Sequence, residues 1–177
     1  MSLASFIFLK NCIMNIKIGQ LAPDFTLYDS TKNKITLSDL KGQNVLLLFF
    51  PLAFTSTCTA ELCSIRDNIS FYNNVNAKVF GISVDSLHTL AKFKSEQSLN
   101  FSLLSDFNKE VSSLYGSLYE MFSYDMKGVS KRSAFVIDKD GIVRYAEVLE
   151  NASEQPNFKN ITLLLERLNN EGVFTIS

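Results

Sequence analysis

The sequence has few of the residues on which many enzyme sites are built. Its 177 residues include one histidine, three cysteines and no tryptophan. The single histidine, His88, falls on a predicted helix, so we expect a surface role rather than a Ser-His-Asp or Cys-His relay. Three cysteines are too few for a disulfide framework and fit a reducing compartment. A net charge of −1 gives no indication of a nucleic-acid or anionic-membrane partner.

Several sequence motifs are also missing. The chain has no HExxH, GxGxxG, P-loop or C-x-x-C pattern, which disfavours a zinc protease, a dinucleotide or nucleotide site and a thioredoxin-type dithiol. No apolar run reaches the length of a membrane span, so we expect no membrane partner.

Residues 1–14 are predicted to be a flexible N-terminal extension, and residues 15–177 a single domain. Leu3–Leu9 is apolar, but no basic side chain precedes it and no small-residue cleavage site follows it. A secretory signal is therefore the less favoured alternative, Met14 is an alternative start, and we expect a cytoplasmic location. Cys12 lies in this extension and is interpreted as a bystander.

The periodicity of apolar residues alternates between strand and helix. Strands are expected at Pro23–Leu27, Asn44–Phe50, Lys78–Val84, Phe101–Leu104, Ala134–Ile137 and Ile142–Val148. Helices are expected from about Cys58 to Tyr72, from a cap at Asp85 or Ser86 to near Asn100, over Lys109–Tyr115, and around Phe158–Leu168. Leu118–Gly128 is expected to be a loop.

This order of elements predicts an α/β fold with helices on both faces of a central mixed sheet. A parallel β-α-β unit spans residues 44–84, and Asp138–Gly141 is a hairpin turn that adds antiparallel pairing. The same order is that of a thioredoxin-like fold.

Cys58 is the candidate nucleophile, since it lies where a loop leaves a buried strand and enters a helix. Free backbone N–H groups and the positive end of the helix dipole favour a thiolate there. Pro51 would direct the chain away from the strand and limit solvent access. The Thr55 hydroxyl could hydrogen-bond the thiolate or a peroxide oxygen. The alternative is a buried structural cysteine beside ordinary loop residues.

The stretch P-x-x-x-T-x-x-C formed by these three residues resembles the active site of peroxiredoxins, the thiol-dependent peroxidases. The resemblance covers nearly the whole chain. It is carried by Ala22–Phe25, Leu46–Cys63, Gly81–Ser86, Leu104–Asp106 and Ser130–Asp138. Phe49–Thr55 resembles the AhpE-like branch, and the second cysteine five residues after Cys58 resembles the peroxiredoxin Q group.

The resemblance implies that Cys58 is oxidised to sulfenic acid with Thr55 and Pro51 around it, and that Arg132 is the distant active-site arginine. A guanidinium suits this role, because attack on an O–O bond builds negative charge on the leaving oxygen. Arg132 precedes a predicted strand and could project into a site at the sheet end. Glu61, expected in the first helical turn, could orient an arginine or simply complement the helix dipole. Arg66 is a weaker second candidate near the thiol.

Cys63 bears on how the oxidised cysteine is resolved. It lies about 140° around the helix from Cys58, on the face of Arg66 and away from Leu62 and Ile65. We therefore expect Cys63 to be reachable and to act as the resolving thiol. On an intact helix the two Cα atoms are too far apart for a disulfide, so the first turns would have to unwind.

The predicted activity is reduction of hydrogen peroxide and organic hydroperoxides, with recycling by a thioredoxin-like protein or a low-molecular-weight thiol. No metal or organic cofactor is expected, and a homodimer is the family-level expectation. One alternative is a one-Cys enzyme whose Cys58 is resolved by an external thiol. The others are a thiol-disulfide exchange protein and a redox sensor.

Overall fold

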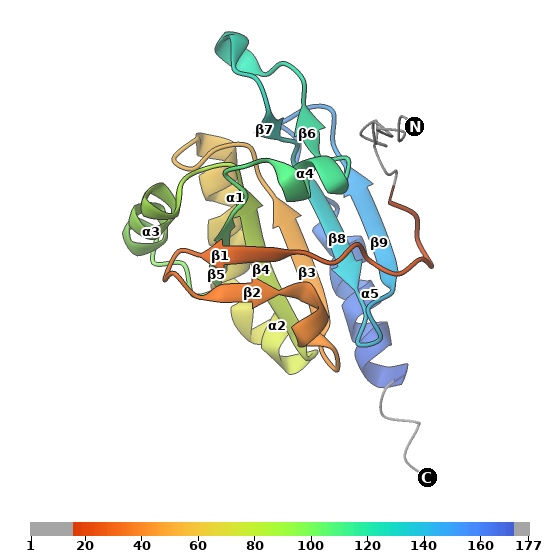
Figure 1. Ribbon diagram of the computed structural model, residues 1–177. Coiled ribbons are helices and arrows are strands. Elements are labelled where there is room, and N and C mark those ends of the chain that lie inside the picture. The colour runs from red at the N-terminus through yellow and green to blue at the C-terminus, as the bar shows by residue number, and fades with distance from the viewer. Residues whose placement is uncertain (1–15, 172–177) are drawn as a thin grey trace, which may run out of the picture.

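The apolar runs of the sequence form the strands of one seven-stranded sheet, seen in the computed structural model, which describes residues 16–171 (Figure 1). The strands are β1 (Thr26–Asp29), β2 (Lys34–Thr36), β3 (Asn44–Phe49), β4 (Ala77–Ser83), β5 (Ser102–Ser105), β8 (Ser133–Ile137) and β9 (Val143–Val148). Their order is β2-β1-β5-β4-β3-β8-β9. β3, β4 and β5 are parallel, whereas β8 is antiparallel to β3. The predicted mixed sheet and thioredoxin-like α/β fold are confirmed.

β3 lies inside the sheet between β4 and β8, and every one of its six residues is buried. Alternate side chains serve two cores: Leu46 and Leu48 point to one, and Leu47 and Phe49 to the other. Neighbouring strand β4 carries Gly81, where a Cβ atom would lie 2.7 Å from Leu103 Cδ2. A side chain at position 81 would therefore require the Leu103 side chain to move.

Helices cover both faces of the sheet. They are α1 (Ser56–Asp67), α2 (Ile69–Asn74), α3 (Leu87–Glu96), α4 (Glu110–Leu114) and α5 (Phe158–Glu171), with 3-10 turns η1 (Leu37–Leu40) and η2 (Ser123–Asp125). Side chains of α1, α2, α3 and α5 share one core, and Val111 of α4 and Leu37 of η1 belong to the other. In Figure 1, α4 lies in front of the sheet while α1, α2 and α5 lie behind it. None of the helices within residues 16–171 is long and apolar enough to cross a membrane.

The predicted helix from Cys58 to Tyr72 is two helices. Asn68 leaves the helical region (φ −108°, ψ 13°), and its Nδ2 donates to the Ser64 carbonyl at 2.8 Å. An asparagine side chain that bonds the backbone locally competes with the helical ladder, so α1 ends and α2 starts at this residue.

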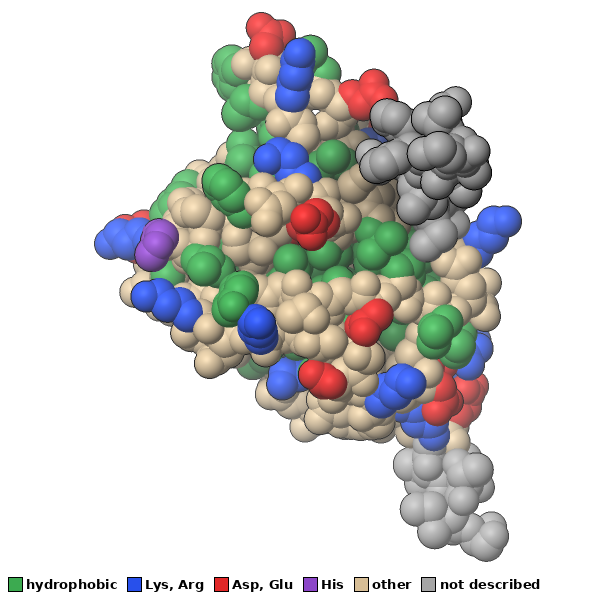
Figure 2. All heavy atoms as spheres, in the orientation of Figure 1, with side chains coloured by type: hydrophobic (Ala, Val, Ile, Leu, Met, Phe, Trp, Pro, Cys, Tyr) green, Lys and Arg blue, Asp and Glu red, His purple; other side chains and the backbone are tan. Residues whose placement is uncertain are grey.

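The predicted loop over Leu118–Gly128 instead begins with a short ladder. β6 (Leu118–Tyr119) pairs antiparallel with β7 (Val129–Ser130), and the connection projects from the top of the view. Met121 and Tyr124 are exposed on it, and apolar side chains gather at this projection (Figure 2). Two-residue strands are too short to leave an alternating pattern in the sequence.

Predictions for residues 1–14, Cys12 among them, lie outside the described residues. The prediction of one domain over residues 15–177 also extends beyond them.

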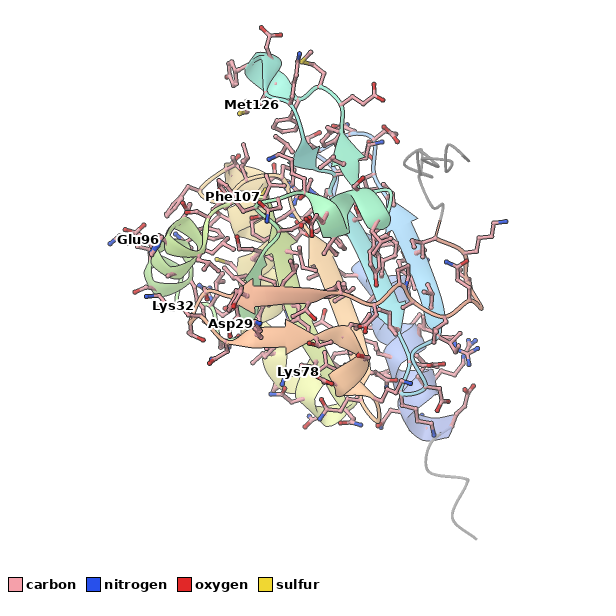
Figure 3. All side chains as sticks on the ribbon, viewed as in Figure 1. Asp29, Lys32, Lys78, Glu96, Phe107 and Met126 are labelled. Atoms are coloured by element: carbon pink, nitrogen blue, oxygen red, sulfur yellow. The ribbon has the colours of Figure 1, made fainter. Side chains whose placement is uncertain are left out.

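The topology brings several connections to one edge of the sheet. The carboxyl ends of the parallel strands β3, β4 and β5 meet there, and β8 starts there because Ser133 pairs with Phe49. In Figure 1 this edge is at the top, and Phe107, labelled in Figure 3, marks the loop after β5. The segments after β3, after β4 and before β8 are thus neighbours although they are far apart in the sequence.

Candidate active site

Pro51 ends the central strand. Phe50 N–H donates to the Ile82 carbonyl at 2.9 Å, and the next residue is a proline with no N–H to continue the ladder. Pro51 is buried, and the chain turns from it towards α1. The Thr55 hydroxyl donates to the Leu52 carbonyl at 2.9 Å, so this turn is closed by a side-chain hydrogen bond.

Thr55 is the residue before α1, with an extended backbone (φ −81°, ψ 150°). Its side chain is exposed and makes no capping bond to the helix. The amides of Ser56, Thr57 and Cys58 precede the first helical bond, which runs from Thr59 N–H to the Thr55 carbonyl. Unpaired amides at a helix start favour negative charge close by.

Cys58 is the third residue of α1 and is 1% exposed. Its Sγ accepts a hydrogen bond from Arg132 Nη2 at 3.3 Å. The predicted place at the start of a helix therefore brings the sulfur into contact with the predicted arginine. A positive guanidinium next to a buried sulfur stabilises negative charge on it.

Arg132 directly precedes β8, as the sequence predicts. It is 1% exposed. Besides the sulfur, it forms an ion pair through Nη1 with Glu61 Oε2. Its Nε and Nη2 donate to the Ala152 carbonyl at 3.1 and 3.0 Å. The contacts with Glu61 and the Ala152 carbonyl fix the plane of the guanidinium, and they thereby hold Nη2 in place next to Cys58.

Glu61 is fully buried and orients Arg132. Because α1 starts at Ser56, this carboxylate lies in the second helical turn rather than the predicted first turn. Its Oε1 has no hydrogen-bond partner within the described part of the chain. Burial raises the pKa of Glu61 to about 7, although the nearby Arg132 works in the opposite direction.

Cys63 is half-buried on another face of α1. Its Sγ lies 3.8 Å from Gln97 Oε1, just beyond the end of α3. Arg66 faces the same residue: its Nη1 donates to the Gln97 carbonyl at 2.6 Å, and its Nε pairs with Asp67 at 2.8 Å. Arg132, rather than Arg66, is therefore the arginine that contacts Cys58. Both helical cysteines are free thiols.

Two residues of this region give little signal in the sequence. Ala152 contributes only its carbonyl, which any residue type could supply. Asp85 looks like a helix cap, but Ser86 is the cap of α3, and the Asp85 carboxylate accepts the Ala53 N–H at 2.8 Å. In the sequence, this role of Asp85 is indicated only by an acidic residue that follows a strand, and such a residue fits a helix cap equally well.

His88 is exposed on α3, away from these contacts. Within residues 16–171, the His, Cys, Asp and Glu side chains form no cluster of three or more that could hold a metal ion.

Comparisons with known proteins agree with this geometry. The sequence model of the AhpC/TSA family matches residues 18–146. A putative peroxiredoxin of Mycobacterium tuberculosis is 40% identical over 131 residues, covering 73% of this chain and 83% of that protein. Alkyl hydroperoxide reductase E of the same organism is 39% identical over 136 residues, covering 75% and 86%.

A solved structure is similar as well. The crystal structure of peroxidoxin BcpB from Mycobacterium tuberculosis superposes with a TM-score of 0.75 at 31% identity, covering 86% of this chain and 97% of that one. With the matched family model spanning most of the chain, this protein belongs to the AhpC/TSA family, the peroxiredoxins, and is a thiol-dependent peroxidase.

Proposed function

We propose that Cys58 is the peroxidatic cysteine and that it reduces hydrogen peroxide and organic hydroperoxides. The observation that carries this proposal is the 3.3 Å contact between Cys58 Sγ and Arg132 Nη2, with both residues 1% exposed. The name of the related alkyl hydroperoxide reductase supports organic hydroperoxides as substrates.

In the reaction, the Cys58 thiolate attacks one peroxide oxygen and forms an S–O bond as the O–O bond breaks. The sulfur is oxidised to sulfenic acid, and the departing oxygen takes up a proton and leaves as water or an alcohol. Negative charge shifts from sulfur to the departing oxygen. Arg132, which is already desolvated and oriented, stabilises that charge without rearranging.

Thr55, Pro51 and Glu61 support this chemistry in different ways. The Thr55 hydroxyl donates a hydrogen bond to the Leu52 carbonyl, so the lone pairs of its oxygen remain free to accept a hydrogen bond from a hydroperoxide. Pro51 ends the strand and sets the course of the loop. Glu61 orients Arg132 and, with its pKa raised by burial to about 7, competes less for the guanidinium charge when protonated.

Cys63 is proposed as the resolving thiol. Five residues on an α-helix rise about 7.5 Å, whereas a disulfide needs Cα atoms within about 4.4–6.8 Å. Formation of the bond therefore requires the first turns of α1 to unwind. The half-buried position of Cys63, outside the fully buried core, supports this role over a purely structural one.

The regenerating reductant is proposed to be a thioredoxin-like protein or a low-molecular-weight thiol. A cytoplasmic location and a homodimer remain predictions as well. The low cysteine content supports a reducing compartment.

Mass spectrometry after one equivalent of hydrogen peroxide tests these assignments. We expect the wild type to become about two mass units lighter with a Cys58–Cys63 disulfide, since two thiol hydrogens are lost. Cys63→Ser should stop as Cys58 sulfenic acid, and Cys58→Ser should not be oxidised rapidly. A wild type that itself stops at sulfenic or sulfinic acid would make Cys63 structural and assign resolution to an external thiol. Rapid oxidation that spares Cys58 would refute the central proposal.

A further inference from the structure

Asp85 lies two residues beyond β4, at the sheet edge that carries the active site. Its Oδ2 accepts the Ala53 N–H at 2.8 Å and the Ser83 hydroxyl at 2.8 Å. Its own N–H donates to Ser83 Oγ at 3.2 Å, and its carbonyl accepts the Ser105 hydroxyl at 2.6 Å. Asp85 is therefore fixed to the ends of β4 and β5 while its carboxylate reaches across to the loop after β3.

The Ala53 N–H is a group that needs such a partner. Ala53 is 9% exposed, and within residues 16–171 its N–H has no backbone acceptor. An N–H left unpaired in a buried loop is costly, and a charged acceptor satisfies it more strongly than a neutral one.

The next residue adds strain to the same turn. Phe54 has φ +67°, in the left-handed region that bulky side chains rarely adopt. Its ring packs edge-on against Phe93, with 5.0 Å between ring centroids. A strained residue keeps its conformation only where its surroundings hold it. The Asp85 carboxylate on one side and the Phe93 ring on the other hold this one.

We propose that Asp85 is a positioning residue for the peroxidase reaction. It makes no contact with the sulfur and acts through the turn of residues 52–55, which leads directly into α1. By holding that turn, it keeps Cys58 Sγ within 3.3 Å of Arg132 Nη2. This proposal rests on Cys58 being the peroxidatic cysteine.

The test compares two reagents that place different demands on Cys58. Hydrogen peroxide needs the thiolate and a correctly placed Arg132, whereas iodoacetamide needs the thiolate alone. Both second-order rate constants are measured on the full chain carrying Cys12→Ser and Cys63→Ser, at a pH where alkylation of each variant has reached its plateau. Cys58 is then the only thiol, and the ratio of the two constants reports on positioning.

Asp85→Ala is expected to lower the peroxide rate constant about ten- to a hundredfold, because small misplacements of reacting groups have effects of that size. The iodoacetamide constant should change by less than about threefold on the same reasoning. Asp85→Asn keeps an oxygen that accepts from Ala53, so it should restore most of the peroxide rate. The matched control is Asp24→Ala, since Asp24 also accepts backbone N–H groups, from Phe25 and Ser38, but in another loop. It should leave the ratio unchanged.

An unchanged ratio in a folded Asp85→Ala protein overturns the proposal, as does an equal loss in Asp24→Ala. Should Asp85→Ala not fold, Ser83→Ala replaces it. That variant removes the hydroxyl that orients the carboxylate, so it should lower the ratio a few-fold, and an unchanged ratio again overturns the proposal. A parent protein in which peroxide does not oxidise Cys58 refutes the assignment of Cys58 instead, whatever the Asp85 variants do.

Discussion

The two cysteines of α1 lie in contrasting surroundings on one short helix. Near Cys58, the ion pair between Arg132 and Glu61 is almost completely buried, with side chains 1% and 0% exposed. On the face of Cys63, the pair between Arg66 and Asp67 is solvated, with side chains 28% and 63% exposed. An arginine–carboxylate pair thus occurs in both places, and the exposure of each pair to water distinguishes them.

This difference determines what each arginine does. In water an ion pair contributes little, because solvent screens the charges and the side chains lose freedom. In a buried pair each charge depends on its partner, since neither retains its hydration. Arg132 therefore provides a fixed field at the sulfur, whereas Arg66 mainly links α1 to the end of α3 through the Gln97 carbonyl.

Loss of Arg132 should have the largest effect on stability. At about pH 9, where Glu61 is ionised, Arg132→Met leaves this carboxylate buried without its partner and is expected to cost about 3–5 kcal/mol in the free energy of unfolding. The same change at Arg66 should cost less than about 1 kcal/mol. Urea denaturation of both variants gives the comparison. The double variant Arg132→Met/Glu61→Leu should recover much of the loss, and equal losses at the two arginines would contradict the contrast.

The rate of Cys58 oxidation should distinguish Arg132 from Arg66 almost as strongly as protein stability does. Arg132→Lys keeps a positive charge but loses the planar fork that bonds sulfur, carboxylate and carbonyl together. We expect the rate constant for Cys58 oxidation by hydrogen peroxide to fall about a hundred- to a thousandfold. Arg66→Lys is the matched control and should react like the wild type in stopped-flow measurements. A fully active Arg132→Lys would exclude the guanidinium geometry as the source of the rate.

Glu61 gives the buried pair a dependence on pH. Its pKa rises from 4.5 to about 7 in the folded protein because burial disfavours the charge. The folded state then binds a proton that the unfolded state has already released, so stability is highest below pH 4.5 and falls as pH rises to about 7. At about 1.4 kcal/mol per pKa unit, the rise from 4.5 to about 7 makes this contribution about 3.5 kcal/mol at most. Unfolding free energies measured from pH 4 to 8 should show the fall in the wild type and not in Glu61→Gln; parallel curves would contradict it.

A change at Arg66, on the exposed end of α1, should have the smallest effect on stability. Its main effect should be on the rate of disulfide formation. Arg66→Ala removes the bond to the Gln97 carbonyl and should alter stability by less than about 1 kcal/mol. Because that bond fixes the part of α1 that carries Cys63 to the end of α3, its loss should let Cys63 approach Cys58 more readily, and disulfide formation between them should become a few-fold faster. Asp67→Ala keeps the Gln97 bond and serves as the control. The informative measurement is the rate of disulfide formation after a peroxide pulse, and a slower rate in Arg66→Ala would argue against this tether.

Local patterns in the sequence predict much of the site. Cys58 is predictable because an apolar strand, a proline and a helical pattern meet around it, whereas Arg132 is assigned by the resemblance to peroxiredoxins and its place before an apolar run only agrees with that assignment. The contacts with Ala152 and Asp85 could not be predicted in the same way, since they depend on which loops the sheet order brings to one edge. The pairing of β6 with β7 and the helix break at Asn68 were missed because each depends on only a few residues.

The near-complete enclosure of Cys58 has a consequence for the timing of the catalytic cycle. At 1% exposure, the Cys58 residue of the reduced fold offers almost no surface to the thiol of another protein. In the proposed mechanism, a protein reductant therefore reaches the active site only after disulfide formation has unwound the first turns of α1. Under that mechanism, enclosure of Cys58 separates the two half-reactions in time and limits exchange of the reduced thiol with unrelated disulfides.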